Sequence, residues 1–423
     1  MKNRIQITQV HPVVEGGQYA AKAAVGDQLR VSAVVFREGH DKVAAAVRYR
    51  MVGDAQWDEA LMAGQTGDVF TATIPVDRNG SWVFEIIGWT DHYATWLDGL
   101  VKKHQAGVAD LELELEEGAL LLLAHTAPAG IPAPVPKVLK ATATMLRDTD
   151  VAVHQRVDAA RDPAVVQAVI QHPDRRDPTT SATFPLWVDR ARAGFSAWYE
   201  FFPRSVGSDG VRSGTFATAA TRLPAIAAMG FDVVYLPPIH PIGRSYRKGP
   251  NNTLVAGPHD PGVPWAIGSE DGGHTAVHPD LGTLEDFDAF VAAARAEGLE
   301  VALDYAIQCS PDHPWVTEHP EWFRHRADGT IAYAENPPKK YQDIFPVDFD
   351  TADIDGLCDE LKHVLEFWID RGIEIFRVDN PHTKPVAFWE WCIAEIQAEH
   401  PDVLFLAEAF TRPAMMSKLA EVG

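Results

Sequence analysis

The first 115 residues alternate short apolar runs with polar turn segments, a pattern that predicts an antiparallel β-sandwich. The runs are rich in Val, Thr and aromatic residues and occupy Gln28–Phe36, Val43–Met51, Val69–Pro75 and Ser81–Trp89. Polar segments such as 38–41 separate them. No candidate catalytic group stands in this region, so we expect it to act as a structural, interface or sugar-binding domain.

The pattern changes after residue 115. The segment Thr126–Lys137 is rich in Pro and Ala and predicts an extended linker. By contrast, Val138–Asp158 and Pro163–Gln171 have the periodicity of helices. We therefore expect residues 116–184 to form a helical insertion and a return linker.

From residue 185 onward, strand-like apolar runs alternate with amphipathic helical stretches. Strands are predicted at Phe195–Phe202, Val233–Leu236, Val301–Leu303, Ile373–Val378 and Val403–Ala407. Helices are predicted at Thr215–Met229, after a capping pattern at Thr283, at Ile354–Arg371 and at Pro385–Gln397. This rhythm favours a parallel sheet in a (β/α)8 TIM barrel. Residues 310–353 are too long for an ordinary loop, so we expect a small inserted domain there.

The predicted barrel is incomplete, because residues 185–423 supply about five of its eight βα repeats. Five strands that do not close would leave an exposed edge and an open core. We therefore interpret the sequence as the N-terminal part of a longer protein. It would carry a β-sandwich with a helical insertion, followed by a partial catalytic barrel.

Composition and charge narrow the function classes. The formal net charge of −22 argues against nucleic acid or an anionic membrane as partner. The N-terminus lacks the apolar core of a signal peptide, and the longest apolar run, Ala119–Ala124, is far short of a membrane span. We therefore expect a cytoplasmic protein. Cys309, Cys358 and Cys392 are too scattered to predict a disulfide framework or a metal cluster.

Two carboxylates stand at the ends of the last two predicted strands. Asp379 follows Phe376-Arg377-Val378, and Glu408 follows the apolar run 404–407. In a strand–helix–strand unit both side chains emerge at the same edge of the sheet, where α/β enzymes place their chemistry. Neighbouring strands lie about 4.8 Å apart, which is closer to the carboxyl separation of retaining glycosidases (about 5–5.5 Å) than to that of inverting ones (about 6.5–9.5 Å). The spacing therefore favours retaining sugar chemistry.

The order and spacing of four motifs identify a family. They are the segment 277–287 (Val-His-Pro-Asp-Leu-Gly-Thr-Leu-Glu-Asp-Phe), Leu303-Asp304, the segment 376–380 (Phe-Arg-Val-Asp-Asn) and the segment 406–408 (Leu-Ala-Glu). Together they resemble the α-amylase superfamily, glycoside hydrolase family 13. Segments 235–243, 247–252, 306–315 and 335–341 are similar to a narrower group within it. That group is the maltosyltransferases that use α-maltose 1-phosphate to extend α-1,4-glucan.

The resemblance implies three catalytic residues. Asp379 would be the nucleophile that forms a β-maltosyl ester, and Glu408 would be the general acid and then the general base. Arg377 lies two residues before Asp379 and so faces the same side of its strand. Its guanidinium can orient Asp379 and hold it ionised. The superfamily's third carboxylate, an Asp after strand seven, would lie beyond Gly423, so we expect negligible turnover from these 423 residues alone.

The resemblance also implies substrate contacts, for which the candidates are Lys248, Asp304, Gln308, Asn336, Lys339, Tyr341, Asn380 and His382. Asn336, Lys339 and Tyr341 would bind the donor phosphate, since a lysine with neutral donors can stabilise that charge in a partly dry pocket. Many amylases carry Asp-x-x-x-Asn-His on strand three, whereas this chain reads Asp304-Tyr-Ala-Ile-Gln308-Cys309. The missing Asn weakens the case for structural calcium, and we expect no metal and no cofactor.

The partners that the resemblance implies are α-maltose 1-phosphate, α-1,4-glucan or maltooligosaccharides, and a second copy of the chain in a homodimer. Two alternatives remain open. One is an amylase-type glucan hydrolase or transglycosylase, which the segment around Lys339 and Tyr341 would discriminate. The other is a non-catalytic glucan-binding protein on a degenerate barrel. Retention of Arg377, Asp379 and Glu408 together argues against the second alternative.

Overall fold

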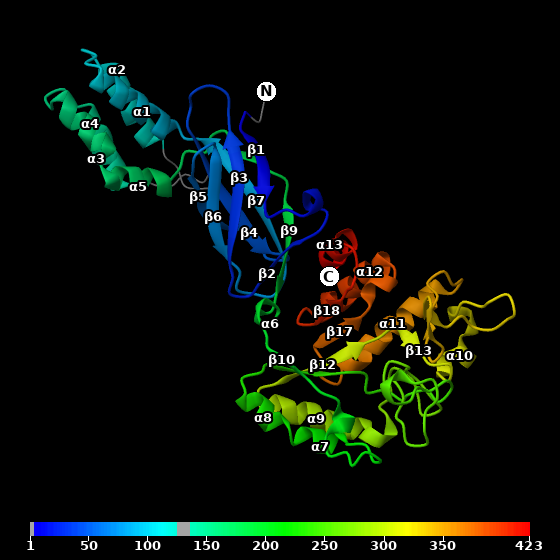
Figure 1. Cartoon of the computed structure of the whole chain (residues 1–423). Coiled ribbons are helices and arrows are strands. Elements are labelled where there is room, and N and C mark those ends of the chain that lie inside the picture. The colour runs from blue at the N-terminus through cyan, green and yellow to red at the C-terminus, as the bar shows by residue number, and fades with distance from the viewer. Residues whose placement is uncertain (1–3, 125–135) are drawn as a thin grey trace. The chain divides into compact units, whose positions relative to one another are not determined.

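The computed structural model describes residues 4–124 and 136–423 (Figure 1). The chain divides into two compact units, Met1–Val188 and Asp189–Gly423. The segment predicted as a Pro/Ala linker lies outside the described residues except for its last two positions.

The first unit is built on an antiparallel β-structure. Its strands are β1 (Gln6–His11), β2 (Ala21–Ala24), β3 (Gln28–Phe36), β4 (Val43–Met51), β5 (Asp58–Gly64), β6 (Val69–Pro75), β7 (Gly80–Thr90), β8 (Thr179–Thr180) and β9 (Phe184–Asp189). Strand order is β1-β3-β6-β5-β4-β7-β9-β2, with β8 added to β7. Because β5 pairs with both β4 and β6, the sheet folds over a shared core that includes Val31, Val47, Ile74 and Phe84. The predicted bounds of β3, β4 and β6 are confirmed.

Five helices form a second core in this unit. They are α1 (His92–Gln105), α2 (Glu112–Leu123), α3 (Lys137–Leu146), α4 (Val153–Arg161) and α5 (Pro163–Gln171). Helix α1 begins inside the range assigned to sandwich strands, because the Asp91 side chain accepts a hydrogen bond from the Ala94 N–H (2.8 Å) and caps a helix directly after β7. The single helix predicted over Val138–Asp158 is two helices, since Asp148 turns the chain by accepting from the Asp150 N–H (3.0 Å).

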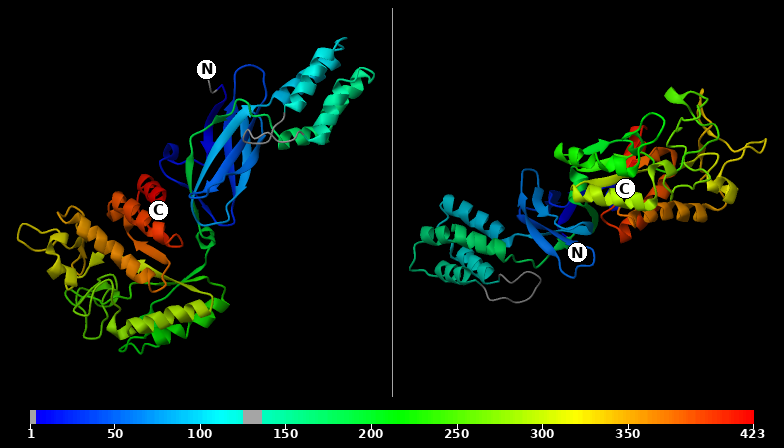
Figure 2. Two further views of the ribbon diagram at one scale, coloured as in Figure 1. Left: turned by 180° about the vertical axis from the view of Figure 1, so that it is seen from behind. Right: turned by 90° about the horizontal axis from the view of Figure 1, so that it is seen from below.

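The second unit contains a parallel sheet whose strands neighbour one another in sequence order (Figure 2). They are β10 (Trp198–Glu200), β11 (Val233–Leu236), β12 (Glu300–Tyr305), β17 (Ile375–Asp379) and β18 (Leu404–Glu408). The connecting helices are α7 (Phe216–Ala220), α8 (Leu223–Ala228), α9 (Leu284–Ala296), α11 (Ile354–Ile369) and α12 (Val386–Glu399), and two further helices are α6 (Ala191–Gly194) and α13 (Pro413–Val422). The predicted βα repeats are therefore confirmed as a parallel strand–helix series.

Several boundaries of the described elements differ from the predicted ones. Strand β9 extends the sandwich by pairing with β7, although residues from 185 onward were assigned to the barrel. The helix predicted over Thr215–Met229 is interrupted between α7 and α8, where Pro224 occupies the first turn of α8. The capping pattern at Thr283 is confirmed, because Thr283 and Asp286 each accept the other's backbone N–H.

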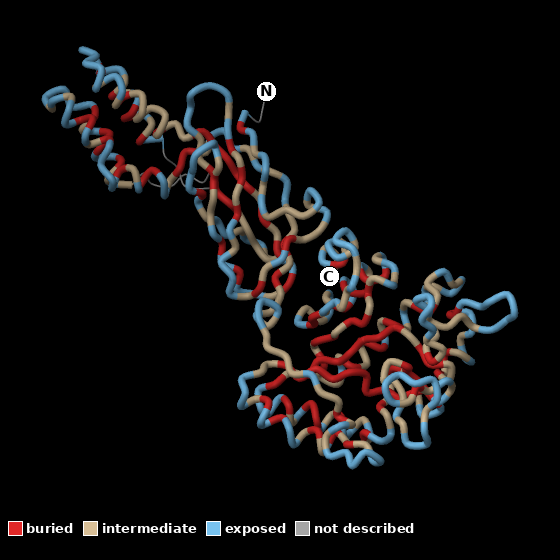
Figure 3. Tube along the Cα trace, in the orientation of Figure 1, coloured by how far each residue is buried: buried red, intermediate tan, exposed pale blue. Residues whose placement is uncertain are grey.

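The long connection after β12 contains short elements only: β13 (Gln308–Cys309), α10 (Pro314–Glu318), β14 (Ala334–Asn336), β15 (Lys339–Tyr341) and β16 (Phe345–Pro346). In Figure 3 the buried residues of this unit run along the central strands and the inner sides of the helices. Phe287, Leu361, Trp368 and Phe376 belong to that core. Among the described residues, we find no helix that is both long and apolar enough to cross a membrane.

Candidate active site

Three carboxylates converge on one guanidinium at the C-terminal edge of the parallel sheet. Strand pairing places Asp304 opposite Arg377 and Asp379 opposite Glu408. Arg377 Nη1 lies 2.7 Å from Asp304 Oδ2 and 3.0 Å from Asp379 Oδ1, and its Nη2 lies 2.6 Å from Glu408 Oε1. Asp379 and Glu408 therefore lie side by side, as predicted. Arg377 on β17 forms ion pairs with both carboxylates.

The electrostatic environments of these carboxyl groups differ. Burial raises the pKa of Asp304 to about 7, although Arg377 and Tyr235 act to lower it. Burial also raises the pKa of Glu408, and a hydrogen bond and charge from Asp379 add to that rise against the charge of Arg377. A carboxyl group that keeps its proton closer to neutral pH can serve as a general acid. Among the three, Glu408 is the most exposed, with 30% of its side chain accessible, which suits exchange of protons with a bound molecule.

The nucleophile candidate is fixed from two sides. Asn380 Nδ2 donates to Asp379 Oδ2 (3.3 Å) while Arg377 contacts the other oxygen. Asn380 adopts a left-handed conformation with φ 44°, which turns the chain sharply at the end of β17. Asn tolerates this region better than most residues because its short polar side chain can bond locally. The turn leads into a cavity beside Asp379.

A cavity of about 670 Å³ lies beside Asp379. Among the predicted substrate contacts, the residues that line it are Gln308, Asn336, Tyr341, Asn380 and His382. The Gln308 side chain donates to the Trp265 carbonyl oxygen (3.1 Å), which ties the loop after β11 to this wall. His382 Nδ1 is buried and has no hydrogen-bond partner among the described residues, so it can accept or donate to a bound hydroxyl. This volume falls within the usual range for small-molecule sites, about 300–1,000 Å³.

Three predicted contacts lie outside this cavity lining, namely Lys248, Asp304 and Lys339. Lys248 is buried, with its Nζ 3.9 Å from Asp343 Oδ1, and both side chains are 4% exposed. Lys339 is exposed on β15, where it pairs with Asn336 across a two-stranded hairpin. The hairpin brings Asn336 and Tyr341 to the cavity but leaves Lys339 at its outside.

Comparisons with known proteins show which proteins this chain is similar to. Residues 3–190 match the family model described as alpha-1,4-glucan:maltose-1-phosphate maltosyltransferase, domain N/S. A protein of Streptomyces coelicolor named alpha-1,4-glucan:maltose-1-phosphate maltosyltransferase 2 is 55% identical over 99% of this chain and 63% of its own length. The maltosyltransferase of the same name from Mycolicibacterium smegmatis is 50% identical over 99% of this chain and 65% of its own. Over nearly its whole length the chain is similar to the alpha-1,4-glucan:maltose-1-phosphate maltosyltransferases.

The chain spans about 63% of the length of the first of these relatives. A crystal structure of an alpha-amylase from Lactobacillus plantarum is 32% identical, covers 50% of this chain and 45% of its own, and has a TM-score of 0.43.

Two residues at the site were not predicted. The Tyr235 hydroxyl donates to Asp304 Oδ2, so it supports the most buried carboxylate of the group. Lys384 lines the cavity, and burial lowers its pKa to about 8 against the opposing charges of Asp379 and Asp304. Tyr235 stands in one of the motif segments and Lys384 lies four residues after another, but only long-range contacts show what they do.

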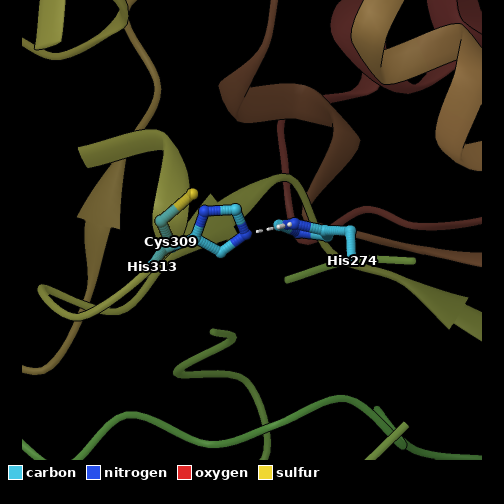
Figure 4. Close-up of side chains that lie close together, drawn as sticks. All are labelled: His274, Cys309 and His313. Atoms are coloured by element: carbon cyan, nitrogen blue, oxygen red, sulfur yellow. Dashed lines mark hydrogen bonds between the residues drawn. The ribbon is translucent and has the colours of Figure 1, made fainter. Parts of the chain in front are cut away.

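A buried histidine–cysteine cluster is one of two groups of possible metal ligands among the described residues, and the other, His319, Glu321 and Asp353, is largely exposed. His274, Cys309 and His313 bring their ligand atoms within 4.8 Å of one another (Figure 4). The Trp315 N–H donates to His313 Nδ1 (3.0 Å), so the proton of this ring lies on Nε2, which bonds to His274 Nδ1 (3.0 Å). His274 in turn donates from Nε2 to the Ala306 carbonyl oxygen (2.9 Å).

This chain of hydrogen bonds leaves no free lone pair on either imidazole for a cation. Burial also raises the pKa of the Cys309 thiol well above its usual value, which opposes the thiolate form that metals need. The cluster therefore acts as a brace that connects the loop after β11 with the end of β12. It does not fit a metal site.

The buried histidines predict acid sensitivity of the second unit. Burial lowers the pKa of His240 to about 4 and that of His274 to about 3, and it also lowers the pKa of His313. An unfolded chain takes up these protons below about pH 6.5, whereas the folded chain does not, so stability is present above that pH and is lost as pH falls toward the folded pKa values.

Replacing His240 with Asn tests this expectation. Asn can keep the hydrogen bond of His240 Nδ1 to the Ala276 carbonyl oxygen (3.0 Å) but cannot take up a proton. The free energy of unfolding, measured with urea, should fall between about pH 6 and pH 4.5 in both chains. In His240→Asn this fall should be shallower than in the original chain by up to about 1.4 kcal/mol per pH unit. The exposed His259→Asn is the control and should keep the original slope. Equal slopes for all three chains would contradict the assignment.

Proposed function

We propose that the protein transfers maltosyl units from α-maltose 1-phosphate to the non-reducing end of α-1,4-glucan and releases phosphate. The observation that carries the proposal is the pairing of Asp379 with Glu408 across β17 and β18, with both carboxylates bound to Arg377. Neighbouring strands lie about 4.8 Å apart, which is closer to the carboxyl separation of retaining enzymes, about 5–5.5 Å, than to that of inverting ones, about 6.5–9.5 Å. The names of the relatives supply the donor and acceptor classes.

The proposed reaction proceeds through two successive displacements at the anomeric carbon. Asp379 attacks the anomeric carbon of the donor while Glu408 gives its proton to the oxygen of the leaving phosphate. The β-maltosyl ester on Asp379 is then attacked by the 4-hydroxyl of the glucan, whose proton returns to Glu408. Arg377 is positioned to keep Asp379 ionised, and the raised pKa of Glu408 supports its role as the acid.

The cavity beside Asp379 supports a polar, phosphorylated donor. Gln308, Asn336 and Tyr341 contribute neutral hydrogen-bonding groups, and His382 contributes an unpartnered ring nitrogen. We propose that Lys339 approaches the phosphate from the edge of the hairpin that carries Asn336. Contacts from Asp304 and Asn380 to the sugar, and from Lys248 to the donor, stay predictions.

The wider architecture is part of the same proposal. Five parallel strands in sequence order are the arrangement of consecutive strands in a (β/α)8 barrel, and we propose that this sheet belongs to such a barrel. The domain boundaries, the homodimer and the cytoplasmic location expected from the sequence stay predictions.

The function is tested with α-maltose 1-phosphate and maltohexaose. The purified full-length protein should release one phosphate for each acceptor that gains a maltosyl unit, as measured by a phosphate assay and mass spectrometry of the glucan. Lys339→Ala should weaken donor use by about tenfold, because a charged hydrogen bond to phosphate is lost. Lys340→Ala, which changes the exposed neighbour on the same strand, is the control and should leave donor use unchanged.

Three outcomes would oppose the proposal. Glucan shortening that needs no phosphorylated donor would indicate an amylase-type hydrolase instead. Binding of glucan without any turnover would indicate a non-catalytic protein. If Lys339→Ala and Lys340→Ala behave alike, the assignment of Lys339 to the phosphate is wrong.

A further inference from the structure

A second polar cavity lies away from the three carboxylates, between the segment after β10 and the loop after β11. Its volume is about 560 Å³. Arg204, Arg212 and Arg247 line it together with serines 205, 208 and 213. We call it the arginine cavity. The chain as a whole carries a net charge of −22, so three arginines around one cavity are a local departure from the charge of the molecule.

One nitrogen of the Arg204 guanidinium is buried without a hydrogen-bond partner among the described residues. This nitrogen is Nη2, and none of the ion pairs among the described residues includes the guanidinium. Burial lowers the pKa of Arg204, the nearby charge of Asp280 opposes that change, and Arg247 adds to it. A desolvated guanidinium without a counter-ion costs free energy, which an anion in the cavity would recover.

Arg247 brings a second positive charge to the same wall in a fixed position. Its Nε donates to the Gly243 carbonyl oxygen (2.8 Å) and its Nη2 to the Ile242 carbonyl oxygen (2.9 Å). Carbonyl groups orient this side chain but do not neutralise it. Two arginines that face one cavity repel each other, so the cavity carries a positive field that favours an anion.

The two carboxylates that line the cavity, Asp260 and Asp280, offset part of this field but form no ion pair with Arg204 or Arg247 in the described part of the chain. Asp260 Oδ2 accepts from the Gly257 N–H, and the Asp280 side chain is 65% exposed. Burial and the charge of Arg204 lower the pKa of His278 to about 4, so this ring is neutral at physiological pH. The remaining lining groups are Arg212, which pairs with Asp209, and the exposed His259.

We propose that the arginine cavity binds a small phosphate-bearing anion, with Arg204 and Arg247 as its cationic ligands. Guanidinium groups match the oxygens of phosphate through paired N–H donors, and serine hydroxyls supply neutral donors beside them. The volume exceeds that of a lone phosphate ion and admits a phosphomonoester with a sugar-sized group. This site is separate from the cavity at Asp379, and the inference does not rest on the proposed transferase activity.

The test measures equilibrium binding of inorganic phosphate and of glucose 6-phosphate by titration calorimetry at constant ionic strength. The chain carries Lys339→Ala in every sample, so that binding at the hairpin beside Asp379 does not contribute. Arg204→Gln should weaken phosphate binding at least about tenfold, the usual cost of a lost charged hydrogen bond. Arg212→Gln, which removes an exposed charge at the same cavity, should weaken it by at most about twofold.

A second variant keeps the test decisive if Arg204→Gln does not fold. Ser208→Asp places a negative charge at the exposed mouth of the cavity and should remove phosphate binding through repulsion. Unchanged affinity in a folded Arg204→Gln or Ser208→Asp chain would overturn the proposal, as would equal losses in Arg204→Gln and Arg212→Gln. Tighter binding of glucose 6-phosphate than of inorganic phosphate would assign the site to a phosphomonoester, and the reverse would assign it to the free ion.

Discussion

Replacing Asp379 with Asn is expected to lower the rate of maltosyl transfer by at least about 10⁴-fold, because the amide cannot attack the anomeric carbon. Asn keeps the shape of the side chain, and Arg377 keeps its contacts with Asp304 and Glu408. The fold should therefore survive. Phosphate release with saturating donor and acceptor measures the loss, and far-ultraviolet circular dichroism checks the fold.

The matched control is Asp350→Asn, which changes an exposed carboxylate of the same unit and should retain full activity. Glu408→Gln adds a positive test of the ester. With a maltosyl donor whose leaving group needs no proton, this chain should accumulate a covalent maltosyl adduct on Asp379 that mass spectrometry detects. An Asp379→Asn chain within about tenfold of the original rate would show that another group forms the bond.

The sequence predicted the parts of this site that depend on strand position alone. Asp379 and Glu408 end adjacent parallel strands, and the period of two puts Arg377 on the same side as Asp379. Strand β11 and the capping box at Thr283 were also predicted, because each of these features depends on only a few consecutive residues. These features follow from backbone geometry and hydrogen bonding within one element.

The contacts that the sequence did not predict join distant segments. Tyr235 meets Asp304 only because β11 and β12 pair, and Lys248 meets Asp343 only because the long connection after β12 folds back. The brace from His313 to His274 likewise joins two separate loops. No periodicity encodes such pairs, because each depends on where a long loop packs. The exposed position of Lys339, outside the lining of the cavity, belongs to the same class.

Replacing Arg377 with Met is expected to destabilise the protein by about 3–5 kcal/mol at about pH 8, the usual cost of removing one partner from a buried ion pair. Arg377 is the shared partner of three carboxylates, and the Asp304 side chain is fully buried. Met retains most of the apolar stem of the arginine, so the change in the free energy of unfolding reports mainly the missing charge. Urea unfolding measures this change.

The free energy of unfolding that Arg377→Met removes should become smaller as the pH falls. The direction of this pH dependence follows from the pKa of Asp304. Burial already raises its pKa to about 7, and removing Arg377 raises it further because the guanidinium acts to lower it. A carboxyl whose folded pKa is raised stabilises the fold below its unfolded pKa, and this contribution is lost as pH rises through the folded value. At about pH 5.5 Asp304 is therefore largely protonated in both folded chains, and the missing guanidinium costs less than at about pH 8.

An exposed ion pair provides the control for this prediction. Arg371 Nη1 lies 2.7 Å from Asp288 Oδ2, but the two side chains are 26% and 45% exposed. Arg371→Met should therefore cost at most about 1 kcal/mol and should show the same loss at both pH values. If Arg377→Met loses as much stability at about pH 5.5 as at about pH 8, Asp304 does not carry the raised pKa on which the expectation depends. A loss below about 1 kcal/mol at both values would mean that the three carboxylates tolerate one another without the guanidinium, through solvent or through Lys384.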